Sequence, residues 1–184
     1  MTTIDHLIET GRVMDLGARE SAPAATGRPA AAEANSSQRM DYDAASPKGM
    51  QSLGLVYGHV LQSNLPKSLV ELVYLRISQI NGCAYCIDMH SRELMKGGFP
   101  VEKLVLVQGW REGGRLFDDV ERAALAWAET VTRVAETGVP EAEYQAAAAM
   151  FEPKDLADLT IAIGLMNAYN RMAISFRKPP QAAA

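Results

Sequence analysis

The sequence is poor in the residues that several common classes of protein require. It has only two cysteines among 184 residues, which excludes the disulfide framework of small secreted domains. Its apolar stretches are too short to span a bilayer. Residues 1–6 have neither the basic start nor the unbroken apolar stretch of a secretory signal. We therefore expect a cytoplasmic protein with no membrane partner.

The charged residues exclude a second group of functions. Lys and Arg number 18 and Asp and Glu number 22, so the formal net charge is -4, and the basic residues form no dense cluster. Binding to nucleic acid or to another polyanion requires such a cluster. The scattered glycines form no phosphate-binding loop. We expect no nucleic-acid partner.

The chain divides into an N-terminal arm and one domain. Residues 21–37 contain 14 Ala, Pro, Gly, Ser or Thr among 17 positions, a composition typical of a linker or a disordered arm. Residues 1–20 have a few apolar side chains at helical spacing, interrupted by glycines, so they could dock on a neighbouring surface or stay mobile. We predict a flexible or docking arm over residues 1–39 and a single domain over residues 40–184.

Helix start and stop signals follow one another along this domain. Pro66 opens an apolar segment that ends at the Asn-Gly pair of residues 81–82, and the next segment ends at the Gly-Gly pair of residues 97–98. Proline suits the first turn of a helix, and glycine suits the residue beyond its end. Pro100 opens another segment. Its apolar run 104–107 fits a strand or a buried helix, and the helical context favours the helix.

The second half of the domain also reads as helical. Asp118 and Glu121 form a capping-box pattern for a helix to about residue 135, another helix follows Pro140, and the last spans residues 153–177. The last helix is apolar on most of its faces, so we expect it at the centre of the fold or against another subunit. Because no alternating strand pattern occurs, the predicted fold class is all-α, a bundle of about six to eight helices.

Cys83, Cys86 and His90 form the most specific pattern in the chain, C-x-x-C-x-x-x-H. In a helix the three side chains fall within roughly a 60° arc of one face. Cys83 directly follows a helix break, so unpaired backbone N–H groups and the helix dipole favour its thiolate. His90 is the i+4 neighbour of Cys86 and can accept its proton. The pair is also close enough in a helix to form a disulfide, which suggests a peroxide or disulfide cycle.

Glu71 is the candidate acid–base partner of this cluster. Residues 69–86 contain only two charged side chains, and a carboxylate in so apolar a segment suggests a function. Twelve residues separate Glu71 from Cys83, about 18 Å along a straight helix, so the break at residues 81–82 has to fold the chain back for them to meet. The alternative is an exposed ion pair between Glu71 and Lys67.

The cysteine pattern has other interpretations. Cys83, Cys86 and His90 could hold zinc with His59 as a fourth ligand, although the residues around the pair suit a continuing helix and His59 suits a core or interface position. A c-type haem site needs a histidine where Ile87 stands, and iron–sulfur ligation needs more cysteines. We therefore expect no cofactor and no metal. A non-catalytic helical module that senses redox state or binds zinc is the second hypothesis.

The ordered set Glu71, Cys83, Cys86 and His90 resembles the AhpD-like alkylhydroperoxidase core of the carboxymuconolactone decarboxylase superfamily. The resemblance covers roughly residues 40–177, and it includes the segments 76–82, 91–93 and 167–171. It implies an all-helical fold, assembly as a trimer or hexamer, and a peroxidase of the peroxiredoxin type that acts in antioxidant defence. In the last segment we expect Asn167, Asn170 and Arg171 to hold helices or subunits together.

The resemblance also implies roles for the four residues. The cysteine pair would cycle between dithiol and disulfide, with Cys86 attacking the peroxide and Cys83 resolving the sulfenic acid, whereas the dipole argument favours Cys83 as the more acidic thiol. Glu71 and His90 would relay protons through water. The substrate would be a hydroperoxide, and the electron donor a lipoyl protein, thioredoxin or small thiol. Some members have a histidine where this chain has Tyr85.

A third hypothesis stays within the same superfamily. Its lactone decarboxylases act without thiol chemistry, so they do not depend on a C-x-x-C pair. The presence of both Cys83 and Cys86 therefore argues against a decarboxylase of this type.

Overall fold

The structure, a computed structural model, describes residues 38–181, so the arm predicted for residues 1–39 lies almost wholly outside the described residues. The described residues form nine α-helices and two 3₁₀ helices and contain no strand, which confirms the all-α prediction. The helices are α1 (Tyr42–Ala45), α2 (Pro47–Leu61), α3 (Lys67–Asn81), α4 (Ala84–Lys96), α5 (Val101–Leu106), η2 (Val107–Glu112), η3 (Gly114–Leu116), α6 (Asp119–Thr132), α7 (Val134–Thr137), α8 (Glu141–Ala148) and α9 (Pro153–Phe176). Since α1 and α7 are single turns of four residues, the longer α-helices agree with the expected six to eight.

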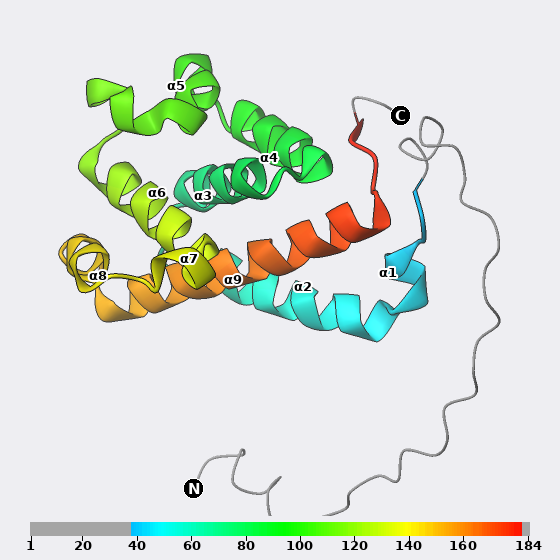
Figure 1. The fold of residues 1–184 in the computed structure, drawn as a ribbon. Coiled ribbons are helices and arrows are strands. Elements are labelled where there is room, and N and C mark those ends of the chain that lie inside the picture. Colours follow the sequence, from blue (N-terminus) through cyan, green and yellow to red (C-terminus); the bar gives the residue numbers. More distant parts are fainter. Residues whose placement is uncertain (1–37, 182–184) are drawn as a thin grey trace, which may run out of the picture.

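Helix α3 lies in the middle of the bundle, and α4, α6 and α9 pack against it (Figure 1). Nine of its fifteen residues are buried, and each buried aliphatic side chain stabilises the fold by about 1.5–3 kcal/mol. Helix α9 packs against α2, α3, α4, α6 and α8, as predicted for a central helix. The core is therefore built around two helices, one of which, α3, carries Glu71.

Local signals located most helix boundaries, and the end of α6 is an exception. The capping box of Asp118 and Glu121 is present at the start of α6. This helix ends at Thr132 and not near residue 135, because Arg133 leaves the helical conformation. The apolar run 104–107 is helical in α5 and η2, as its context predicted. Val107 is fully buried but Val105 is 71% exposed, so the predicted burial holds for only part of the run.

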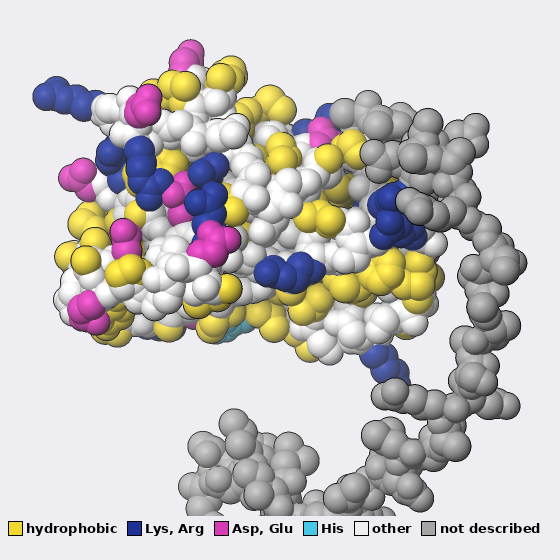
Figure 2. All heavy atoms as spheres, in the orientation of Figure 1, with side chains coloured by type: hydrophobic (Ala, Val, Ile, Leu, Met, Phe, Trp, Pro, Cys, Tyr) yellow, Lys and Arg dark blue, Asp and Glu magenta, His cyan; other side chains and the backbone are white. Residues whose placement is uncertain are grey.

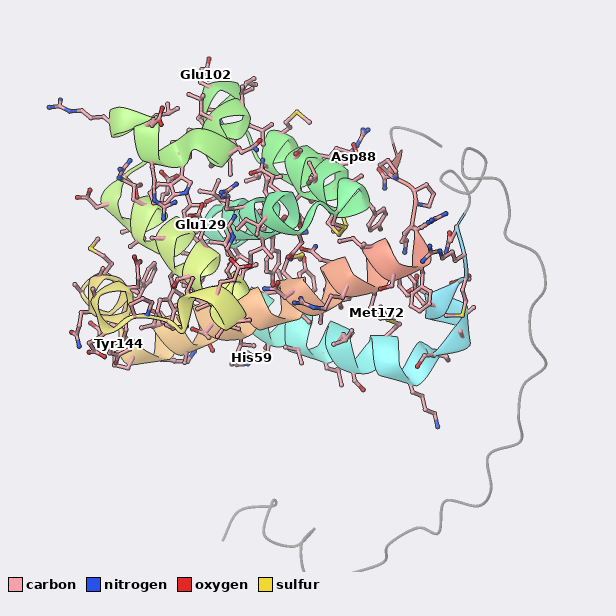
Figure 3. The ribbon with its side chains drawn as sticks, viewed as in Figure 1. His59, Asp88, Glu102, Glu129, Tyr144 and Met172 are labelled. Atoms are coloured by element: carbon pink, nitrogen blue, oxygen red, sulfur yellow. A yellow bond between two sulfur atoms is a disulfide. The ribbon has the colours of Figure 1, made fainter. Side chains whose placement is uncertain are left out.

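A buried carboxylate joins α6 to α3 and η2. Glu129 accepts hydrogen bonds from Nε of Arg76 at 2.7 Å, from Nε1 of Trp110 at 2.9 Å and from Arg111. Figure 3 shows Glu129 in the interior between α6 and α3. Burial alone would raise the pKa of Glu129, but the bonds from Arg111, Trp110 and Arg76 outweigh it and lower the pKa. Glu129 therefore stays ionised and fixes these elements.

Apolar side chains also reach the surface. Figure 2 shows hydrophobic side chains exposed over α5 and along α9, and the exposed ones in α2, α5 and α9 include Leu55, Leu61, Val101, Val105, Ile161 and Ile174. Exposed apolar patches mark contact surfaces in many proteins. None of the helices in residues 38–181 is long and apolar enough to cross a membrane.

Candidate active site

The turn between α3 and α4 brings distant residues together. Helix α3 ends at Asn81, and Gly82 adopts the left-handed conformation with φ 72° and ψ 32°, which glycine tolerates and other residues rarely do. The N–H of Cys83 then donates to the carbonyl of Ser78 at 2.9 Å. Helix α4 folds back along α3, as the break at residues 81–82 predicted.

The fold-back places Glu71 beside His90. Oε2 of Glu71 lies 2.7 Å from Nδ1 of His90, and the two residues are 4% and 3% exposed. This buried position excludes the alternative of an exposed ion pair between Glu71 and Lys67. Nζ of Lys67 lies 3.9 Å from Oε2 of Glu93 instead. Because Nδ1 binds the carboxylate, Nε2 is the nitrogen of His90 that remains for other chemistry.

The two cysteines begin α4. The structure joins Cys83 and Cys86 as a disulfide, with their Cα atoms 5.3 Å apart, and the two residues are 1% and 2% exposed. Cys83 is the N-cap residue, one position before the predicted first turn, and its sulfur accepts the N–H of Cys86 at 3.3 Å. The helix N-terminus therefore acts on Cys83, as the dipole argument expects.

A cavity of about 350 Å³ opens beside this cluster. Cys86, His90 and Glu71 line it, whereas Cys83 does not. The remaining walls are mostly aromatic and sulfur-containing side chains, with two acids and one lysine: Tyr42, Asp43, Met50, Tyr57, Tyr85, Met89, Glu93, Met166, Tyr169, Ala173 and Lys178. Of the two cysteines, Cys86 is therefore the one that lines this cavity.

Lys178 contributes a cation to the cavity. Its Nζ lies 3.0 Å from Oδ2 of Asp43, 5.0 Å from the ring centroid of Tyr42 and 4.9 Å from that of Tyr85. Burial alone would lower the pKa of Lys178, but the bond to Asp43 and the two tyrosines raise it. Sequence reasoning missed Tyr42, Asp43 and Lys178 because they come from opposite ends of the domain.

Three asparagines tie α9 to the end of α3. Nδ2 of Asn81 donates to Oδ1 of Asn167 at 3.0 Å and to Oδ1 of Asn170 at 2.9 Å, and Asn170 donates to the hydroxyl of Ser78 at 3.1 Å. Arg171 donates to the backbone carbonyl of Asn167. The prediction that Asn167 and Asn170 hold helices together is confirmed, whereas Arg171 bonds within its own helix α9, and its role between helices or subunits stays a prediction.

His59 does not belong to the cysteine cluster. It lies on α2 with its side chain 53% exposed, and its Nε2 is 2.9 Å from Oδ1 of Asp158. The prediction of a core position is wrong, because the exposed His59 side chain reaches the buried Asp158 on α9 from the surface. The alternative, an interface position, stays a prediction. Within residues 38–181 no three His, Cys, Asp or Glu side chains are grouped so that they could hold a metal ion. The fourth ligand of the zinc hypothesis, His59, therefore lies apart from the two cysteines and pairs with Asp158.

An all-helical bundle with a buried Glu–His pair beside a C-x-x-C pair defines an AhpD-like protein. The chain belongs to the carboxymuconolactone decarboxylase family, whose model matches residues 47–130. YdfG of Bacillus subtilis (strain 168), an uncharacterised protein, is 31% identical over 139 residues, which are 76% of this chain and 94% of YdfG.

Solved structures agree with this assignment. A protein of unknown function from Agrobacterium tumefaciens, described as a candidate AhpD antioxidant defence protein, is 35% identical with a TM-score of 0.75, over 78% of this chain and 98% of its own. The debrominase Bmp8 has a TM-score of 0.68 over 76% of this chain and 74% of its own. Its identity is 17%, so this second likeness concerns the fold alone.

Proposed function

We propose that this protein is a hydroperoxide reductase that uses Cys83 and Cys86 as a redox pair, with Glu71 and His90 as the proton relay. The observation that carries the proposal is the position of Cys86, which faces the cavity together with His90 while Cys83 is bonded behind it. A thiol reacts as thiolate, so a base that lines the same cavity as the attacking cysteine is what peroxide reduction requires.

The reaction begins with the reduced pair. His90 takes the proton of the Cys86 thiol, and Glu71 stabilises the imidazolium. The thiolate attacks the outer oxygen of the hydroperoxide ROOH, so that an S–O bond forms, the O–O bond breaks and RO⁻ leaves to become ROH. Cys86 is now a sulfenic acid. The thiol of Cys83 attacks its sulfur, water leaves, and the disulfide forms.

The position of Cys83 suits the second half of the cycle. A reducing dithiol has to attack one sulfur and release the other as thiolate, and a better-stabilised thiolate leaves faster. Cys83 caps α4 and accepts the N–H of Cys86, so it is the better leaving group, while Cys86 meets the reductant. The preference of the helix dipole for Cys83 and the attack by Cys86 are therefore compatible.

The electron donor has to reach Cys86 through the cavity, because both cysteines are almost fully buried. A dithiol on a slender arm, such as a lipoyl protein provides, or a small thiol fits this route better than the surface dithiol of thioredoxin. We also propose a homo-oligomer, a trimer or hexamer, that covers the exposed apolar side chains of α2 and α9. Such an enzyme would serve antioxidant defence in the cytoplasm.

One experiment tests the function directly. Protein reduced and freed of reductant is mixed with one equivalent of cumene hydroperoxide, and the peptide that contains Cys83 and Cys86 is analysed by mass spectrometry. We expect the loss of two hydrogen masses, the loss of both free thiols together, and one equivalent of alcohol. Unchanged thiols in the presence of intact hydroperoxide would contradict the proposal.

A further inference from the structure

Two buried polar atoms near the cavity have no hydrogen-bond partner among the described residues, Nε2 of His90 and the hydroxyl of Tyr74. Tyr74 lies on α3 and is fully buried, and its ring centroid is 5.2 Å from that of the His90 imidazole. The proposed mechanism uses Nε2 of His90 and gives no role to Tyr74. A buried hydroxyl without a partner is costly, so its presence beside the relay asks for an explanation.

Tyr57 packs against the buried cluster that contains Tyr74. It comes from α2 and lines the cavity with Cys86. Burial, and then the charge of Glu71, raise the pKa of Tyr57. Burial, and then the neighbouring Tyr57, raise the pKa of Tyr74. Tyr57 shares the cavity wall with Glu71, and the raised pKa values keep both phenols protonated at neutral pH.

The first step of the proposed reaction needs a proton at the leaving oxygen. Breaking the O–O bond releases RO⁻, which is as basic as hydroxide, the conjugate base of water with a pKa of about 15.7. The ordinary pKa of a phenol is about 10, so the phenol of Tyr57, although burial and Glu71 raise its pKa, is a stronger acid than the alcohol that forms. Lys178, the cation of the cavity, is already bonded to Asp43. A tyrosine on the cavity wall is therefore the better-placed acid.

We propose that Tyr57 is the general acid for the leaving oxygen, an assignment that rests on the proposed hydroperoxide reduction. Its hydroxyl donates a hydrogen bond and then a proton to RO⁻, which leaves as ROH. The proton that His90 took from Cys86 returns the tyrosinate to phenol, so the step consumes no further acid. The buried hydroxyl of Tyr74 is the donor available to the tyrosinate while it exists.

The test uses two oxidants that differ in the leaving group. The rate constant for oxidation of the reduced protein is measured with tert-butyl hydroperoxide, which releases a strongly basic alkoxide, and with peracetic acid, which releases acetate. Tyr57→Phe should react about 100-fold more slowly with the hydroperoxide, in the range that loss of a general acid gives. Its rate with peracetic acid should stay within about twofold, because acetate leaves without a proton.

Two further variants complete the test. Tyr74→Phe should show a smaller loss that is again confined to the hydroperoxide. Tyr144→Phe is the matched control, since Tyr144 lies on α8 beside Trp127 and away from the cavity (Figure 3), and it should match the wild type with both oxidants. The peracid reaction also verifies that each variant is folded with a competent thiol.

Three results would overturn the assignment. An equal loss with both oxidants would mean that Tyr57 acts on the thiol or on the fold, and an unchanged rate of Tyr57→Phe with the hydroperoxide would remove its role altogether. In both cases the wild-type protein reacts and the proposed function stands. A wild-type protein that consumes neither oxidant would overturn the proposed function together with this assignment.

Discussion

Oε2 of Glu71 lies 2.7 Å from Nδ1 of His90, although 19 residues separate them in the chain. Both side chains are almost fully buried, and a buried carboxylate is costly unless it is paired. The bond sets the orientation of the imidazole and directs its reactivity to Nε2. In the proposed mechanism Glu71 therefore acts on Cys86 through His90, as a positioning and charge-stabilising residue.

Replacement of Glu71 tests this arrangement. Glu71→Gln keeps an oxygen that can accept the N–H of Nδ1 but loses the negative charge that stabilises the imidazolium. We expect the rate of hydroperoxide reduction to fall by about 100-fold. The rate at which iodoacetamide alkylates reduced Cys86 is measured as a function of pH. In the variant this pH profile should shift to higher pH, because less of the thiol is ionised at neutral pH.

Glu93→Gln is the matched control for this variant. Glu93 also lines the cavity, but its carboxylate is bonded to Lys96 at 2.6 Å and is about one-third exposed. The variant should keep the reduction rate within about twofold. An equal effect of the two substitutions would show that any negative charge near the cavity suffices, which would contradict the specific role of Glu71.

The two cysteines should be separable by single substitutions. Cys83→Ser retains the cysteine that lines the cavity, so Cys86 should react once with hydroperoxide and stop as a sulfenic acid. Cys86→Ser retains only the cysteine that does not line the cavity, so its reaction should be slower by at least about 100-fold. Dimedone labelling followed by mass spectrometry locates the sulfenic acid, and its appearance on Cys83 at the wild-type rate would reverse the assignment.

Local sequence signals were enough to predict the elements that build the site. Proline, glycine and the capping box of Asp118 mark helix ends through short-range effects, and these were found at α3, α4 and α6. The spacing of Glu71 and His90 required a reversal at Gly82, whose positive φ supplies it. Because the four predicted residues lie on two consecutive helices, their proximity follows from one turn.

The rest of the site depends on contacts that no local pattern encodes. Tyr57, Tyr169 and Lys178 reach the cavity from α2, α9 and the segment after α9, and each reads in the sequence as an ordinary core or surface residue. Glu129 likewise looks like one of many acids on an amphipathic helix, and its three donors come from residues 76, 110 and 111. Side chains that meet through tertiary packing alone could not be predicted from one sequence.

Glu129 should make the stability of the protein depend on pH. Its pKa is lowered in the folded protein, so at acid pH the unfolded chain binds more protons than the folded one. The ionised carboxylate therefore stabilises the fold fully at pH values above the ordinary glutamate pKa of about 4.3. This stabilisation is lost as the pH falls through the lowered pKa. We expect Glu129→Gln to lower the free energy of unfolding at pH 7 by about 3 kcal/mol, which corresponds to a melting temperature roughly 6–12 °C lower.

Thermal unfolding monitored by circular dichroism at pH 7 and pH 3 checks this expectation. The difference in melting temperature between Glu129→Gln and the wild type should be smaller at pH 3, because the wild-type carboxylate is then partly protonated and stabilises the fold less. Glu102→Gln, on the surface of α5 (Figure 3), should change the melting temperature by no more than about 1–2 °C. If Glu129→Gln and the wild type differed in melting temperature by the same amount at pH 7 and pH 3, the charge of Glu129 would not explain its contribution to stability.

Gly82 should matter for its backbone conformation and not for its size. Its φ is 72°, and a Cβ atom added there would meet no heavy atom within 4 Å. Gly82→Ala should therefore lower the free energy of unfolding by about 1–2 kcal/mol, because alanine is strained in the left-handed conformation. Denaturant unfolding measures this difference.

Gly54→Ala is the control, because it adds the same methyl group in the open interior of α2. Alanine is the better helix former there, so this variant should raise the free energy of unfolding by about 0.5–1 kcal/mol. Because Gly82 reverses the chain between Glu71 and Cys83, the first variant should also slow disulfide closure while the second should not. If both substitutions stabilised the protein, the turn would not need a left-handed residue, and the fold-back that joins Glu71 to His90 would require another cause.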